Sequence, residues 1–212
     1  MHILVKTLHR VVSRRGSSKV LSFSSPHVFK ALQLLYKEPY VSRISFCKEL
    51  HMGEGAVKTL ILHLKEEGLV DSLRSGTFLT KKGKKFVKEL SKIISAECVI
   101  PKCSISLGKN NHAILLRNFA SEIKTGIEQR DASILYGANG AITILFHNNK
   151  FVFPKEESDC LQSESKIRSL LLENLKPLDG DVIIISSATE SFVAEISAKS
   201  SALFTLAKLT RV

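Results

Sequence analysis

The sequence is poor in the features that mark several large classes of protein. It contains four cysteines in 212 residues, and no two of them form a Cys-x-x-Cys pair. Four cysteines are too few for a disulfide framework, and their spacing does not fit a zinc ribbon. No apolar run approaches the roughly eighteen residues of a transmembrane helix. We therefore expect a cytosolic protein with free thiols, no metal site, no cofactor and no membrane partner.

Acidic residues are scarce in the first half of the chain. Residues 1–96 contain eighteen Lys or Arg against seven Asp or Glu, whereas residues 97–212 contain thirteen of each kind. The net charge of +11 therefore belongs entirely to the first half. This division indicates a polyanion-binding module joined to a module that does not bind polyanions. The alternative is a cationic surface that is merely well solvated.

The first acidic residue of the chain is Glu38, and the opening segment before it is basic. Its cations up to residue 25 are Lys6, Arg10, Arg14, Arg15 and Lys19. Three interpretations fit this segment: a leader that resembles a mitochondrial transit peptide, a basic arm that follows DNA phosphates or the minor groove, or an ordinary first helix packed on the core. We favour the helix or the arm.

Residues 26–95 have the periodicity of helices interrupted by one hairpin. The expected elements are helices over 26–37, 42–50, 54–67 and 81–95, with two β-rich runs over 69–74 and 77–80. Ser42 can cap the second helix, in which Ile44, Cys47 and Leu50 share one face. The third helix has an apolar stripe formed by Val57, Leu60, Ile61 and Leu64, and Gly68 ends it. The Ser75-Gly76 turn between the β-rich runs predicts a hairpin.

Two stretches of this region resemble known motifs. The run from Val57 to Val70 resembles the recognition helix and E-x-G-L-V exit of winged-helix transcription regulators. The run from Phe78 to Gly83 is similar to the L-T-x-x-G by which many of them leave the wing. The resemblance implies that the helix over 54–67 enters the major groove of double-stranded DNA while the hairpin touches the backbone. We assign residues 1–96 to a winged helix-turn-helix DNA-binding domain.

The residues expected to face DNA are polar or cationic and lie off the apolar stripe. The candidate DNA-binding residues are Arg43, Lys58, Thr59, His63, Lys65, Arg74, Lys81 and Lys82. Lysine and threonine reach bases or phosphates, and an arginine at the hairpin positions the domain on the backbone. The helix over 54–67, which is expected to enter the major groove, has two lysines and no arginine, and Glu54 places a carboxylate near its start. Leu62 on the same face indicates contact with a thymine methyl group or with another protein.

The second half follows a polar connection at 97–111. Its expected elements are strands over 113–116, 141–146, 151–153 and 181–186, and helices over 121–135, 164–175 and 189–207. This βαββαβ order with one added helix predicts an α+β protein whose second domain, residues 112–212, is ferredoxin-like. In many regulators such a domain senses a small-molecule effector or forms a homodimer. The two-domain layout, with the phrase from Gly126 to Asp131, also resembles an uncharacterised archaeal family that pairs a winged helix with a C-terminal α/β domain.

The most reactive-looking residues of the second domain lie on its first helix and after its last strand. The candidate ligand-binding residues are Arg130, Asp131, Ser187 and Thr189. An anion can bind where a strand end feeds a helix N-terminus. The alternative is structural: an ion pair between Arg130 and Asp131, with Ser187 or Thr189 as a helix cap.

These patterns together predict a DNA-binding transcription regulator rather than an enzyme. Its partners would be double-stranded DNA, a second copy of the chain and a small-molecule effector. The seven histidines are scattered, and none has a motif partner. Two alternatives remain: a winged-helix adaptor that binds protein without DNA, and an enzyme whose site lies in the C-terminal α/β domain.

Overall fold

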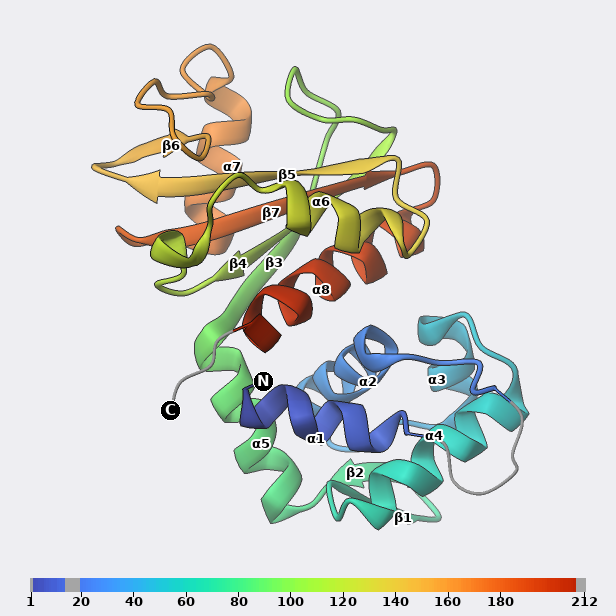
Figure 1. The fold of residues 1–212 in the computed structure, drawn as a ribbon. Helices are drawn as coiled ribbons and strands as arrows, with labels where there is room; N and C mark the ends of the chain where they lie inside the picture. The colour runs from blue at the N-terminus through green and yellow to red at the C-terminus, as the bar shows by residue number, and fades with distance from the viewer. Residues whose placement is uncertain (1, 14–19, 209–212) are drawn as a thin grey trace. The chain divides into compact units, whose positions relative to one another are not determined.

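The computed structural model describes residues 2–13 and 20–208, so Arg14, Arg15 and Lys19 of the basic segment lie outside the described residues. The chain forms two compact units (Figure 1). Unit 1 comprises Met1–Leu90 and Leu206–Val212, and unit 2 comprises Ser91–Thr205. Both units mix helices with strands, so the chain is an α+β protein. Within the described ranges no helix has the length and apolar character needed to cross a membrane.

Unit 1 consists of helices and one hairpin. The elements are α1 (Ile3–Val11), α2 (Ser25–Lys37), α3 (Arg43–Leu50), α4 (Glu54–Glu66), β1 (Val70–Leu73), β2 (Gly76–Leu79) and α5 (Lys81–Ile93). Strands β1 and β2 pair in antiparallel register, and a single bridge between Val41 and Thr77 joins the residues before α3 to the hairpin. Helix α1 buries Val5, Leu8 and Val11, as an ordinary first helix does.

The core of unit 1 is formed by the apolar sides of its helices. All four residues of the predicted stripe on α4 are buried, namely Val57, Leu60, Ile61 and Leu64. Helix α3 differs from the expectation, because Phe46 and Leu50 are its buried residues while Ile44 is 82% exposed. Phe46 and Leu50 are four positions apart, so they share one side of this two-turn helix. The stripe expected through Ile44 was therefore wrong.

The L-T-x-x-G run leads from β2 into α5 and connects the start of α5 to the end of α4 by hydrogen bonds. The Thr80 hydroxyl donates a hydrogen bond to the carbonyl of Gly68 at 2.7 Å and accepts one from the amide of Gly83 at 3.0 Å. A Cβ atom at position 83 would lie 1.9 Å from the carbonyl oxygen of Leu69. Glycine is therefore required at position 83, because any side chain would collide with the backbone that leaves α4.

We expect Gly83→Ala to lower the free energy of unfolding by about 3 kcal/mol, at the upper end of the cost of overpacking, because the atom that it meets belongs to the backbone. The measurement is urea unfolding followed by circular dichroism. The control is Gly55→Ala in the first turn of α4, where an added Cβ meets no atom within 4 Å. That control should be neutral or slightly stabilising. Equal stabilities for the two variants would contradict the close approach at Gly83.

Unit 2 is built on one antiparallel sheet. Its elements are β3 (Ile94–Ile100), β4 (Asn110–Leu116), the 3-10 helix η1 (Ala120–Glu122), α6 (Ile127–Ile134), β5 (Gly140–His147), β6 (Lys150–Val152), α7 (Ser165–Leu175), β7 (Asp181–Ala188) and α8 (Ser191–Lys208). The strand order is β3-β4-β7-β5-β6, and every neighbouring pair is antiparallel. All eight residues of β7 are buried, which confirms the prediction of a central strand.

This sheet differs from the expected ferredoxin-like arrangement in two ways. Helix α5 passes directly into β3, so residues 97–100 lie in a strand and not in the linker expected over 97–111. In addition, the fourth strand of the expected set, β7, lies between β4 and β5, where a ferredoxin-like sheet has its third strand. The third strand, β6, has three residues and stays at the edge beside its hairpin partner. A strand of eight residues with the apolar run Val182 to Ile185 at its middle buries more surface at the centre than the three-residue β6 would.

Helices cover both faces of the sheet in unit 2 (Figure 1). Helix α7 packs on one face, where its Ile167 and Leu171 share a core cluster with Ile183 and Ile185 of β7. Helices α6 and α8 cover the other face. There the hydroxyl of Ser133 on α6 lies 2.7 Å from that of Ser186 on β7 and 2.8 Å from that of Ser201 on α8. Small side chains with mutual hydrogen bonds allow these helices to approach the sheet closely.

A buried ionic cluster joins β3 and β4 to α8. The Lys199 side chain is fully buried, donates to Glu97 and lies 3.3 Å from Glu195. The imidazole of His112 lies 3.2 Å from the Glu97 carboxylate. Burial by itself raises the pKa of Glu97, but the hydrogen bond from His112 and the charge of Lys199 outweigh it and hold that pKa far below its ordinary value. Glu97 is therefore ionised in the folded protein.

We expect Lys199→Met to lower the free energy of unfolding by about 3 to 5 kcal/mol, because it leaves the buried Glu97 carboxylate without its cation. A carboxyl group with a lowered pKa contributes its full stability above the unfolded value of about 4.5 and loses it as the pH falls further. The difference between wild type and variant should therefore shrink below that pH in urea titrations. The double variant with Glu97→Gln should recover part of the loss. A Lys199→Met protein as stable as wild type would refute this account.

Candidate nucleic-acid interface

The surface feature that fits the sequence motif is a cleft of about 640 Å³ in unit 1. It lies between the start of α3, one face of α4 and the β1–β2 hairpin. Residues 41–44 form one wall and residues 72–77 form the other. The floor comes from α4 and comprises Glu54, Lys58, Ile61, Leu62 and Lys65. The cleft therefore brings together the two segments that the resemblance predicted would contact DNA, the helix α4 and the hairpin, and adds the start of α3 to them.

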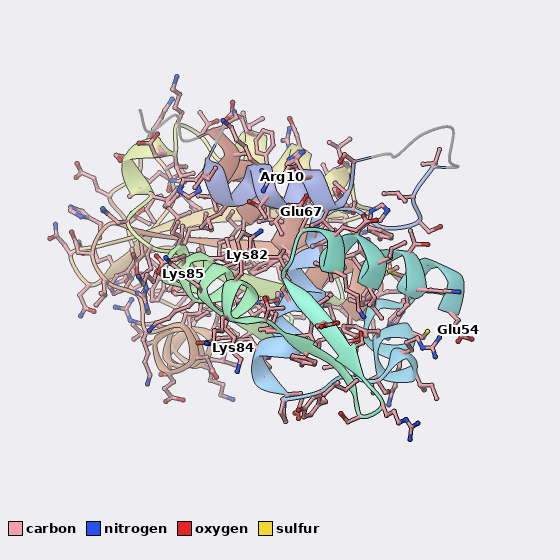
Figure 2. All side chains as sticks on the ribbon, turned by 90° about the horizontal axis from the view of Figure 1, so that it is seen from below. Arg10, Glu54, Glu67, Lys82, Lys84 and Lys85 are labelled. Carbon is pink, nitrogen blue, oxygen red and sulfur yellow. The ribbon has the colours of Figure 1, made fainter. Side chains whose placement is uncertain are left out.

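Helix α4 presents one continuous strip to this cleft. Glu54, Lys58, Leu62 and Lys65 follow one another at intervals of four, four and three residues, which places them on the same side of a helix. The buried stripe occupies the adjacent side, and its Ile61 lies at the edge of the cleft. Glu54 lies at the end of α4 nearest α3 (Figure 2). The apolar stripe therefore identifies these four residues as lying off the core, but it does not separate them from Thr59 and His63, which do not line the cleft.

Two of the four cations at the cleft are paired with carboxylates of the same unit. Arg43 lies 3.6 Å from Glu54, and Lys65 lies 3.1 Å from Asp71. A hydrogen bond from the Ser72 amide and the adjacent Lys65 lower the pKa of Asp71, so this carboxylate stays charged. Both pairs are exposed and contribute little to stability. Lys58 and Arg74 are exposed, and neither has a carboxylate partner within the described residues.

Three aliphatic side chains are exposed in the same cleft. Ile44 is 82% exposed, Leu73 is 61% exposed and Leu62 is 54% exposed. They come from three different elements, namely α3, β1 and α4. The sequence pointed to Leu62, because that residue lies off the apolar stripe. Ile44 was missed because its segment pattern groups it with Leu50, which is buried, and no side was predicted for Leu73.

The structure separates the eight candidate DNA-binding residues into two groups. Arg43, Lys58, Lys65 and Arg74 line the cleft, whereas Thr59, His63, Lys81 and Lys82 do not. The Thr59 hydroxyl donates to the carbonyl of Gly55 at 3.0 Å within its own helix. The Lys82 ammonium donates to the carbonyl of Glu67 at 2.6 Å and so caps the C-terminal end of α4. Lys81 is exposed at the first position of α5.

His63 was wrongly placed on the DNA-facing side. Its side chain is buried, and its Nδ1 atom lies 2.6 Å from the carbonyl oxygen of Val11 in α1. Its ring also packs edge to face on Phe23, with 5.9 Å between centroids. A second contact joins Arg10 of α1 to Glu67, the residue that follows α4, at 3.1 Å (Figure 2). His63 therefore holds α1 against α4, which the local pattern around residue 63 does not reveal.

The four candidate ligand-binding residues of unit 2 do not converge on one site. Arg130 pairs with Asp131 at 3.0 Å, as in the structural interpretation. Ser187 is buried, donates to Asn111 and accepts from the amide of Leu107. Thr189 is exposed, and its carbonyl accepts from Asn110. Within the part of the chain that the structure describes, no group of three or more His, Cys, Asp or Glu residues is arranged to hold a metal ion.

Comparisons with known proteins match both parts of the chain. A family described as "PH0730-like, N-terminal domain" matches residues 28–85, and a "Domain of unknown function (DUF4443)" matches residues 107–206. The solved structure of the "Hypothetical protein PH0730 from Pyrococcus horikoshii OT3" is similar to this chain, with a TM-score of 0.71 and 26% sequence identity. The similarity covers 86% of this chain and 92% of that one. No curated protein matches the chain. These matches fit an archaeal family that joins the two domains.

We expect His63→Leu to lower the free energy of unfolding by about 1 to 2 kcal/mol, because it removes a buried hydrogen bond and keeps most of the side-chain volume. The variant should leave the salt dependence of any DNA binding unchanged, since His63 faces α1. Urea unfolding and DNA titrations at several salt concentrations measure the two effects. A changed salt dependence of DNA binding at unchanged stability would indicate that His63 contacts DNA and does not pack on α1.

Proposed function

We propose that unit 1 is a winged helix-turn-helix domain that binds double-stranded DNA and that the chain is a transcription regulator. The observation that carries this proposal is the cleft whose floor is one face of α4, with Lys58 and Arg74 exposed beside it and unpaired within the described residues. A helix of this kind fits the major groove, and the adjoining hairpin lies along the backbone. The cleft belongs to the half of the sequence that holds the whole charge excess.

Further cations on unit 1 support binding to a polyanion. The start of α5 carries the exposed lysines Lys81, Lys82, Lys84 and Lys85, three of which are labelled in Figure 2. Charges of this kind raise the affinity for any duplex without selecting a base sequence. In this proposal the lysines of α5 account for the affinity for DNA, whereas the cleft accounts for the position of the domain on the duplex.

Unit 2 is proposed to organise a homodimer or to sense a small-molecule effector. Two properties support a role separate from DNA binding: the unit has its own hydrophobic core, and residues 97–212 contain equal numbers of acidic and basic residues. The ligand-binding residues expected from the sequence do not carry this proposal, because they are engaged in structural contacts.

A protein-binding adaptor is the second candidate function for unit 1. The observation that favours it is the exposure of Ile44, Leu62 and Leu73 in one cleft, since exposed aliphatic groups that cluster mark interaction sites. Measurement of duplex binding separates the two candidates, because an adaptor of this kind would not bind DNA.

We expect Lys58→Ala to weaken duplex binding and to reduce the slope of log affinity against log salt concentration by about 0.9, the value for one phosphate contact. The matched control is Lys166→Ala, which removes an exposed lysine from α7 in unit 2 and should leave the slope unchanged. Fluorescence anisotropy of a labelled duplex at several salt concentrations gives the slopes. Equal slopes for wild type and Lys58→Ala would exclude this contact, and the absence of binding even at low salt would favour the adaptor.

A further inference from the structure

The inference made here rests on the proposed function and concerns the chemical feature of DNA that α4 reads. Bases are distinguished in the major groove by hydrogen bonds to their edges or by apolar contact with the C5 methyl group of thymine. The guanine and adenine edges require donors such as arginine, lysine, asparagine or glutamine. The side chains at the floor of the cleft therefore limit what the domain can recognise.

Hydrogen-bond donors are few on the reading face of α4. Lys65 is held by Asp71 at 3.1 Å, and Arg43 on the neighbouring wall is held by Glu54 at 3.6 Å. Thr59 donates within its own helix and does not line the cleft. Lys58 is the α4 cation that lines the cleft without a carboxylate partner among the described residues. A single lysine on phosphate positions a protein but selects no sequence.

Apolar groups dominate the centre of the same face. Leu62 follows Lys58 by one helical turn and is 54% exposed, although its helix has a complete buried stripe without it. Ile44 and Leu73 approach the cleft from its two walls and are more exposed still. These three side chains offer neither donors nor acceptors. Their favourable partner in a major groove is the methyl group of thymine.

We propose that Leu62 reads thymine methyl groups in the major groove, with Ile44 and Leu73 completing the apolar surface. The preferred site would then be defined by the positions of thymines rather than by guanine contacts. Lys58 and Arg74 flank this surface with positive charge, which matches phosphates on either side of a groove. This charge complementarity favours a duplex over an apolar protein segment as the occupant.

The experiment begins with selection of duplexes by the full chain from a random-sequence pool. Each thymine of a selected duplex is then replaced by deoxyuridine, which removes only the C5 methyl group. We expect replacement of a contacted thymine to weaken binding about fourfold, the equivalent of one buried methyl group. Leu62→Ala should weaken binding to the thymine duplex but should bind thymine and uracil duplexes equally. This double-mutant cycle separates the contact from changes in DNA shape.

The matched control is Leu135→Ala, which truncates an 83% exposed leucine in unit 2 and should preserve the preference for thymine. Equal affinity of the wild-type protein for thymine and uracil duplexes would overturn methyl readout and leave DNA binding intact. An undiminished thymine preference in Leu62→Ala would overturn the role of Leu62. If no duplex is retained at low salt, the proposed DNA binding fails, and methyl readout fails with it.

Discussion

The packing of helix α4 on two sides is the constraint on which the site depends. Its apolar stripe lies in the core of unit 1, and His63 holds a second side against α1 through the carbonyl of Val11. One strip of the helix remains for contacts with another molecule, and it contains Lys58 and Leu62. Which face of α4 is exposed in the cleft is thus a consequence of core packing and of one long-range hydrogen bond, because the helix cannot rotate without losing both.

The polar contacts of the chain fall into two classes with different consequences. In unit 1 the ion pairs of Arg43 and Lys65 are exposed, contribute little to stability and mainly reduce the positive charge available to a ligand. In unit 2 the pair between Lys199 and Glu97 is buried, so loss of Lys199 leaves the Glu97 carboxylate without its cation in the interior. The first class therefore sets the free positive charge of the cleft, whereas the second fixes the position of β3 against α8.

Features set by neighbouring residues were predictable, and features set by distant residues were not. The stripe on α4 and the β1–β2 hairpin follow from spacings within a few residues. The burial of His63 depends on a partner 52 residues away, and the burial of the Glu97 carboxylate in β3 depends on Lys199, 102 residues away. Helix α3 has eight residues, too few for its apolar pattern to decide which side is buried.

Affinity and specificity reside on different side chains in the proposed interface. Lysines attract phosphates at every sequence, so variants of Lys58 change how binding responds to salt and leave base preference alone. Leu62 carries no charge, so its removal changes base preference and leaves the salt response alone. The two effects are therefore separable in one set of titrations. A protein partner in the same cleft would produce neither, because an apolar segment offers no phosphates to release counterions and no methyl group that deoxyuridine removes.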